Sequence, residues 1–416
     1  MPDWCRALAV GTLLGVMCGA PGETIAACTQ QGSVAGAGPG VEVNQGGGKP
    51  AAFRPEGADA RAREAYRRAR EWQARGDADG ALALLWQASG LAPGDADIQT
   101  ALAEALERVG ALDTAIEAWR AALAARPEDR KASRGLVLAL VAAGRSPEAV
   151  TLARAAAEAA PKDADALFTL GLAQSEQDVE AALATLRHVL ARAPDHTLAR
   201  YNLALLLNRV DRRDEAIAEL MRVIALEARP EANYALGVAW WHRGEAARAT
   251  AAFQATIALE PRHAEAYHKL GVVRAAERDW DGAAAALRRS LALRPDVPEV
   301  HVSLARVLSA SGDEAGARAQ LAEGERLRQE SEREHEARVW TALGSARLEH
   351  GDAIAALDAF RRALAIRNTY APAHFQMGRA LERLGDADAA EGAYTRARQL
   401  NPRLVRGSRT APERVP

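Results

Sequence analysis

Side chains that could perform acid–base, nucleophilic or metal chemistry are thinly spread along these 416 residues. The nine histidines are scattered, and the pairs that could be proposed, His263 with His268 and His335 with His350, lack the spacing of a metal motif. The glycines of 32–48 have no strand before them and no helix directly after, so they do not form a phosphate loop. No nucleophile elbow occurs either. We therefore expect no metal site, no cofactor and no enzymatic activity.

All three cysteines, Cys5, Cys18 and Cys28, precede residue 29. The chain after them can form neither an internal disulfide nor a thiolate metal site. The net charge of −2 combines both signs, which argues against a basic face for nonspecific nucleic-acid binding. We expect no nucleic-acid partner.

The sequence itself is built from a repeated pattern. An alanine recurs at intervals of 33, 34 or 39 residues, and a proline follows twelve residues after many of these alanines. Internal periods of this length are typical of a solenoid of stacked units. The alanines are Ala81, Ala115, Ala149, Ala182, Ala216, Ala249, Ala283, Ala317, Ala356 and Ala390.

Each unit has the pattern of two amphipathic helices joined by a short turn, as in residues 264–297. Twelve residues before the shared alanine stands another small residue, such as Gly271 or Gly344, which predicts close packing of the two helices. A glycine five residues before the alanine, such as Gly244, predicts a helix end in the left-handed conformation.

This pattern resembles the tetratricopeptide repeat, which combines Leu-Gly, an aromatic residue, Ala-x3-Phe and Pro over 34 residues. Copies begin near residues 62, 96, 130, 164, 197, 230, 264, 298, 337 and 371. The resemblance implies an all-α fold, a right-handed α-solenoid of about ten helix-turn-helix units. The most complete copy has Leu236, Gly237, Trp240, Ala249, Phe253 and Pro261 in order.

The eighth copy has Arg318 and Glu325 where inner copies have apolar residues, as the terminal copy does with Glu391 and Arg398. A charged segment follows and lengthens the interval by five residues. Our hypothesis divides the array into repeats 1–8 over 62–325, a charged helical extension over 326–336, and repeats 9–10 over 337–402. The alternative is a solvated helix in an unbroken superhelix, because charge runs are usually solvated faces.

Residues 1–28 combine Arg6, an apolar run and Cys28, and resemble a secretory signal rather than a membrane-spanning helix. Ile25 to Cys28 also resemble the bacterial lipobox, which implies lipidation of Cys28 and a periplasm-facing lipoprotein at the cell envelope, held to the membrane by its lipid anchor only. Soluble secretion, a retained amino-terminal anchor and a mis-assigned start remain open. Residues 29–61 have the composition of a disordered Gly-rich tether, and 403–416 that of a disordered tail.

In the tetratricopeptide family the first helix of each unit lines the concave groove, and the resemblance implies that the second, fifth, ninth and twelfth places face a ligand. The alternative is that these side chains pack as ordinary core, as an aromatic stripe at helical spacing usually does. The middle copies place there Phe168, Leu172, Tyr201, Leu205, Asn208, Tyr234, Val238, Trp241, His268 and Val272.

Aromatic side chains at such places favour binding of a protein or peptide partner. The sequence therefore predicts a non-enzymatic scaffold at the bacterial cell envelope that binds a protein segment in its groove, as an assembly or export factor. Two alternatives stay open. One is an accessory that selects substrates in trans for an enzyme such as a glycosyltransferase, and the other is a self-associating structural array.

Overall fold

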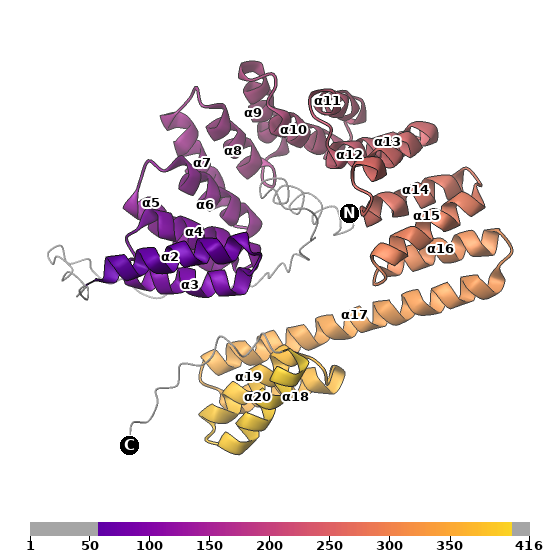
Figure 1. Ribbon diagram of the computed structural model, residues 1–416. Helices are drawn as coiled ribbons and strands as arrows, with labels where there is room; N and C mark the ends of the chain where they lie inside the picture. Colours follow the sequence, from indigo (N-terminus) through magenta and orange to yellow (C-terminus); the bar gives the residue numbers. More distant parts are fainter. Residues whose placement is uncertain (1–56, 402–416) are drawn as a thin grey trace. The chain divides into compact units, whose positions relative to one another are not determined.

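The computed structural model describes residues 57–401, which form nineteen helices and no strand (Figure 1). Within each unit, successive helices pack in pairs that correspond to copies of the sequence repeat. The predicted all-α solenoid of about ten helix-turn-helix units is confirmed. The predicted signal, most of the tether and the tail lie outside the described residues, and the first helix begins at Ala58, ahead of residue 62.

The chain divides into two compact units, the first ending at Glu245 and the second beginning at Ala246, within the turn of the sixth copy. The first unit holds α2 (Ala58–Ala74), α3 (Ala78–Leu91), α4 (Ala96–Arg108), α5 (Leu112–Ala125), α6 (Arg130–Ala142), α7 (Ser146–Ala159), α8 (Ala164–Gln174), α9 (Val179–Arg192), α10 (Thr197–Arg209), α11 (Arg213–Leu226) and α12 (Pro230–His242). The second holds α13 (Ala246–Leu259), α14 (Ala264–Ala276), α15 (Trp280–Leu293), α16 (Pro298–Ala310), α17 (Glu314–Glu349), α18 (Ala353–Ile366), α19 (Ala371–Arg383) and α20 (Ala387–Leu400).

The shared alanines are all buried, and the small residues opposite them make room for large side chains. A Cβ built on Gly344 would lie 2.4 Å from Phe360, and one on Gly271 would lie 2.6 Å from Leu287. These contacts are too short for any side chain larger than hydrogen. The recurring small residue therefore lets the two helices of a unit approach closely, as the sequence predicts.

The turn glycines have positive φ, from 73° at Gly144 to 94° at Gly312. In two of the three copies that lack this glycine, Asp211 and Arg278 occupy the same place with φ of 66° and 65°. The left-handed conformation thus recurs in nearly all of these turns, and glycine is the residue that adopts it without steric cost.

Each linker between repeats is tied to the helix that follows it. Aspartates such as Asp95 and Asp129 cap the first helices by accepting backbone N–H bonds, and His263 does the same through Nδ1. A side chain in the first turn also reaches back to a carbonyl of the linker: Gln99 donates to Pro93 O over 3.0 Å, and His301 Nε2 lies 3.0 Å from Pro295 O. These bonds fix the angle at which one repeat enters the next.

Helix α17 differs from all the others because its 36 residues belong to two repeats at once. Its first part is the second helix of the eighth copy and packs on α16, and its last part is the first helix of the ninth copy and packs on α18 (Figure 1). The residues between, 326–336, continue the same helix without a break.

Candidate functional site

Eight of the predicted groove residues lie on three first helices of the first unit. Spacing of four and then three residues places those of one helix on a single face. They are Phe168 and Leu172 on α8, Tyr201, Leu205 and Asn208 on α10, and Tyr234, Val238 and Trp241 on α12.

Phe168, Leu172 and Tyr201 are buried and belong to the core between helices. The ring of Phe168 lies 4.9 Å from the ring of His196, which caps α10. Burial raises the pKa of the Tyr201 phenol above its usual range. In this conformation these three side chains offer a ligand little surface.

The other five residues, Leu205, Asn208, Tyr234, Val238 and Trp241, are half-buried. Together they leave apolar and aromatic atoms partly open to water on α10 and α12. The side-chain oxygen of Asn208 is buried without a hydrogen-bond partner. An unmade bond of this kind costs about 1–3 kcal/mol in the stability of the chain.

A shallow cleft of about 30 Å³ joins this surface to α8, with Leu172 and Leu205 on its walls. Arg209 borders it, donating 2.9 Å to Glu176 and also to the carbonyl of Ser175. A volume of this size holds only a few water molecules. The surface therefore suits a segment that lies across the helices rather than a small molecule enclosed in a cavity.

His268 and Val272, the last two predicted residues, are half-buried on α14 of the second unit. His268 Nε2 lies 3.1 Å from Ser303 Oγ on α16. Burial lowers the pKa of His268 to about 4. The ring is therefore neutral at physiological pH and contributes packing and one hydrogen bond to the contact between first helices.

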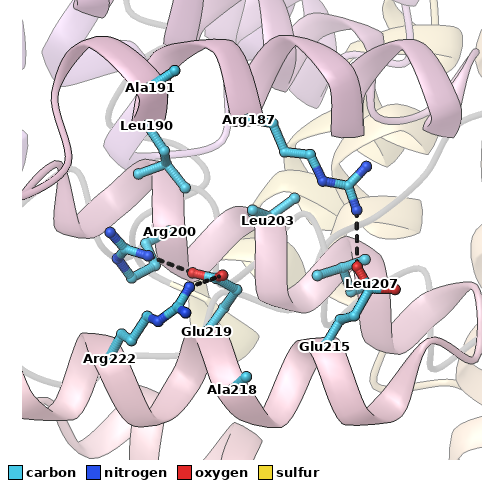
Figure 2. A pocket seen from close by; sticks show the side chains of 10 residues that line it. All are labelled: Arg187, Leu190, Ala191, Arg200, Leu203, Leu207, Glu215, Ala218, Glu219 and Arg222. Atoms are coloured by element: carbon cyan, nitrogen blue, oxygen red, sulfur yellow. Dashed lines mark hydrogen bonds and ion pairs between the residues drawn. The ribbon is translucent and has the colours of Figure 1, made fainter.

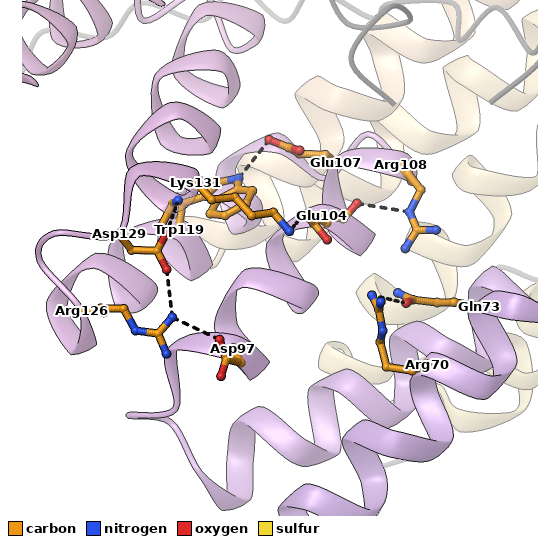
Figure 3. Close-up of polar contacts among 11 residues, drawn as sticks. Arg70, Gln73, Asp97, Glu104, Glu107, Arg108, Trp119, Arg126, Asp129 and Lys131 are labelled. Carbon is orange, nitrogen blue, oxygen red and sulfur yellow. Dashed lines mark hydrogen bonds and ion pairs between the residues drawn. The ribbon is translucent and has the colours of Figure 1, made fainter. Parts of the chain in front are cut away.

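Some charged side chains on the first helices of the opening repeats are paired within the chain (Figure 3). Lys131 lies 2.5 Å from Glu104, and Arg70 donates to Gln73. Glu107 accepts a 2.9 Å bond from Trp119 Nε1, and burial raises the pKa of its carboxyl to about 7.

A larger open cleft, about 550 Å³, lies among α9, α10 and α11, and the sequence analysis did not predict it. Leu190, Leu203 and Leu207 form its apolar part (Figure 2). Arg200 and Arg222 both point to Glu219, at 2.5 and 2.6 Å. No motif in the sequence marks this cleft, because it depends on how far α9 and α11 stand apart.

The buried Arg200 in this cleft also serves as a structural tie of its repeat. It donates to Pro194 O in the linker and to Glu219 on the second helix. In the eighth copy His301 makes the equivalent two contacts, to Pro295 O and to Gln320. The contacts of Arg200 at this cleft therefore serve the packing of the repeat and do not by themselves indicate a ligand site.

Residues 57–401 contain no group of three or more His, Cys, Asp or Glu side chains arranged to hold a metal ion. Over the same residues, no helix has the length and apolar character needed to cross a membrane.

Stacked helix pairs with a shared small-residue register and half-buried side chains on the first helices define a helical-repeat protein. Comparison with known families gives the family. Four tetratricopeptide repeat models match the chain. The first matches residues 274–343, the second 100–164, 134–177 and 246–298, the third 371–404 and the fourth 165–196. The chain belongs to the tetratricopeptide repeat family.

Several solved structures are similar to parts of this chain. MamA is 23% identical over 39% of this chain and 96% of its own, with a TM-score of 0.38. A tetratricopeptide repeat protein from Parabacteroides merdae is 18% identical over 60% and 99%, with a TM-score of 0.48. A human IFIT1 dimer with PPP-AAAA is 14% identical over 80% and 89%, with a TM-score of 0.40. No curated protein matches the sequence.

Proposed function

We propose that this chain is a non-enzymatic scaffold of the bacterial cell envelope that binds an extended or helical segment of another protein across α10 and α12. The observation that carries this proposal is the half-burial of Leu205, Tyr234, Val238 and Trp241 on the first helices. The core of the same repeats uses other residues, such as Leu203 and Ala235. Partly exposed apolar and aromatic groups on rigid helices are suited to serve as binding hot spots.

The chemistry of this surface favours a partner segment with apolar side chains. Tyrosine and tryptophan offer a large contact area while losing few rotatable bonds, and a polar tip that tolerates water. A segment with apolar side chains would match these features.

Capture with a tagged chain tests this surface. Val238→Glu places a carboxylate among the apolar side chains and should abolish capture of the partner. The control is Met221→Glu on the second helix α11, where the side chain is 55% exposed and away from the proposed surface. Equal capture by the two variants would contradict the proposal, provided both have the helical circular dichroism of the unmodified chain.

The envelope location rests on residues 1–28 and the Gly-rich segment after them. We propose that Cys28 is lipidated and that the repeats are held at the membrane by this anchor, where the protein serves as an assembly or export factor. Cys28→Ser should move the protein from the membrane fraction to the soluble fraction of the cell. An unchanged distribution between these fractions would argue against the lipid anchor. It would not bear on the proposed binding surface of α10 and α12.

A further inference from the structure

Neighbouring repeats pack through the same register of apolar residues. Between α15 and α16 the contact is made by Leu287 from the second helix of one repeat and by Val300 and Leu304 from the first helix of the next. These side chains are 0%, 2% and 2% exposed. Burial of such leucines is what holds a repeat array together, because each unit leaves an apolar face for its neighbour.

At the boundary between the eighth and ninth copies the same register is exposed. In the copies that begin at 264, 298 and 337, Leu321 takes the place of Leu287, and Val339 and Leu343 take the places of Val300 and Leu304. All three lie on α17 and are 48%, 52% and 39% exposed. This boundary therefore leaves Leu321 on one side and Val339 with Leu343 on the other exposed and not covering one another, with the charged Arg318 and Glu325 beside Leu321.

The cause is visible in the linker. At most other boundaries a proline, such as Pro261 or Pro295, stands between the second helix of one repeat and the first helix of the next. Residues 326–336 contain neither proline nor glycine and are rich in Glu and Arg, which favour a helix. Ion pairs along the helix add support: Arg326 lies 2.6 Å from Glu323 and 2.9 Å from Glu330. The helix continues, and its length separates the two faces.

We propose that two copies of this chain pair through α17, with Val339 and Leu343 of each copy covering Leu321 of the partner subunit. Adjacent helices at a regular repeat boundary run antiparallel, so the two α17 helices would lie antiparallel about a twofold axis near residue 331. Each copy contributes both faces, and the contact is made twice. The pairing reproduces between two chains the boundary that other repeats make within one.

The second copy is the occupant that the structure favours over closure within one chain. Closure would require α17 to break inside 326–336, where most residues are good helix formers and ion pairs hold the helix. A second copy requires no such change. It also brings the apolar face that the repeat register pairs with this one at the other boundaries.

Sedimentation velocity of the purified chain tests the pairing. The chain has a mass of 44.2 kDa, and we expect a species of twice that mass whose fraction rises with concentration. Leu343→Glu and Leu321→Glu should each give the monomer. Ile354→Glu, on α18 where the side chain is 74% exposed, is the matched control and should leave the dimer intact. A monomer at every concentration in the unmodified chain would overturn the proposal.

Disulfide trapping distinguishes the pairing of two copies through α17 from other contacts between chains. Cys5, Cys18 and Cys28 are first replaced by serine, and Leu321→Cys and Leu343→Cys are then made in separate chains. Oxidation of the mixture should link one chain of each kind, because the two sites meet only between copies. A third chain carries both cysteines. A disulfide within that chain, without a dimer, would show closure within one chain and contradict the pairing of two copies. So would links between identical sites only.

Discussion

The indole Nε1 of Trp119 on α5 donates a 2.9 Å hydrogen bond to Oε1 of Glu107 on α4, joining the two helices of the second repeat. Trp119 is buried, and Gly135 on α6 stands so close that a Cβ there would lie 2.4 Å from the ring. The carboxyl of Glu107 is therefore held near the core, and burial raises its pKa to about 7 although the bond from Trp119 acts in the opposite direction.

This raised pKa predicts how stability depends on pH. Because the pKa of Glu107 is about 7 in the folded chain and lower in the unfolded chain, the folded state binds more protons between these values. The free energy of unfolding should therefore fall as pH rises through this window and level off above pH 7. Ionised Glu107 destabilises the folded chain fully above its folded pKa of about 7, and not at all below its pKa in the unfolded chain.

Glu107→Gln keeps an acceptor for Trp119 but cannot ionise. We expect it to raise the free energy of unfolding at pH 8 by on the order of 1–3 kcal/mol and to change it little at pH 4. Urea denaturation at the two pH values measures this difference, with the exposed Glu128→Gln as control. Equal effects of Glu107→Gln at both pH values would be inconsistent with an ionisable buried carboxyl.

Arg278 has a φ of 65° at a turn where other repeats have glycine. A residue with a Cβ is strained in this conformation, so Arg278→Gly should stabilise the chain by about 1 kcal/mol. The converse change Gly244→Ala, at a φ of 83°, should destabilise it by a similar amount. Thermal denaturation measures both. Loss of stability in Arg278→Gly would mean that the arginine side chain contributes more than its backbone costs.

Gly344 and Gly392 both lie inside helices but have different surroundings. A Cβ on Gly344 would approach the buried Phe360 to 2.4 Å, whereas one on Gly392 meets nothing within 4 Å. Gly344→Ala should therefore destabilise the chain by about 1–3 kcal/mol through overpacking. Gly392→Ala should stabilise it by about 0.5–1 kcal/mol through helix propensity. Denaturation midpoints with the same sign would refute the packing role of Gly344.

Much of the fold follows from the sequence, because the repeat register is a local property. The spacing of alanine, small residue and turn glycine determines which residues are buried in each pair, and the turn needs a left-handed residue even where Asp211 provides it. Repetition makes each of these patterns visible in most of the ten copies. The helix pairs could therefore be predicted without the structure.

The candidate surface is less predictable, since equivalent register places differ in exposure. Tyr201 and Tyr234 both stand at the fifth place of their copies, yet Tyr201 is buried and Tyr234 half-buried. A single repeat does not encode this difference, because exposure depends on what packs against each side chain. Leu321 on α17 shows the same difference. It is exposed, whereas Leu287, at the equivalent place on α15, is buried.

Site-specific photocrosslinking in intact cells tests the binding surface most directly. A photoreactive residue in place of Tyr234 should capture one partner protein, and one in place of Arg248, exposed on the second helix α13, should not. Val238→Glu in the same chain should remove the Tyr234 product while the protein stays folded. Capture from both positions alike, or from neither, would contradict the assignment of α10 and α12 as the surface that binds another protein.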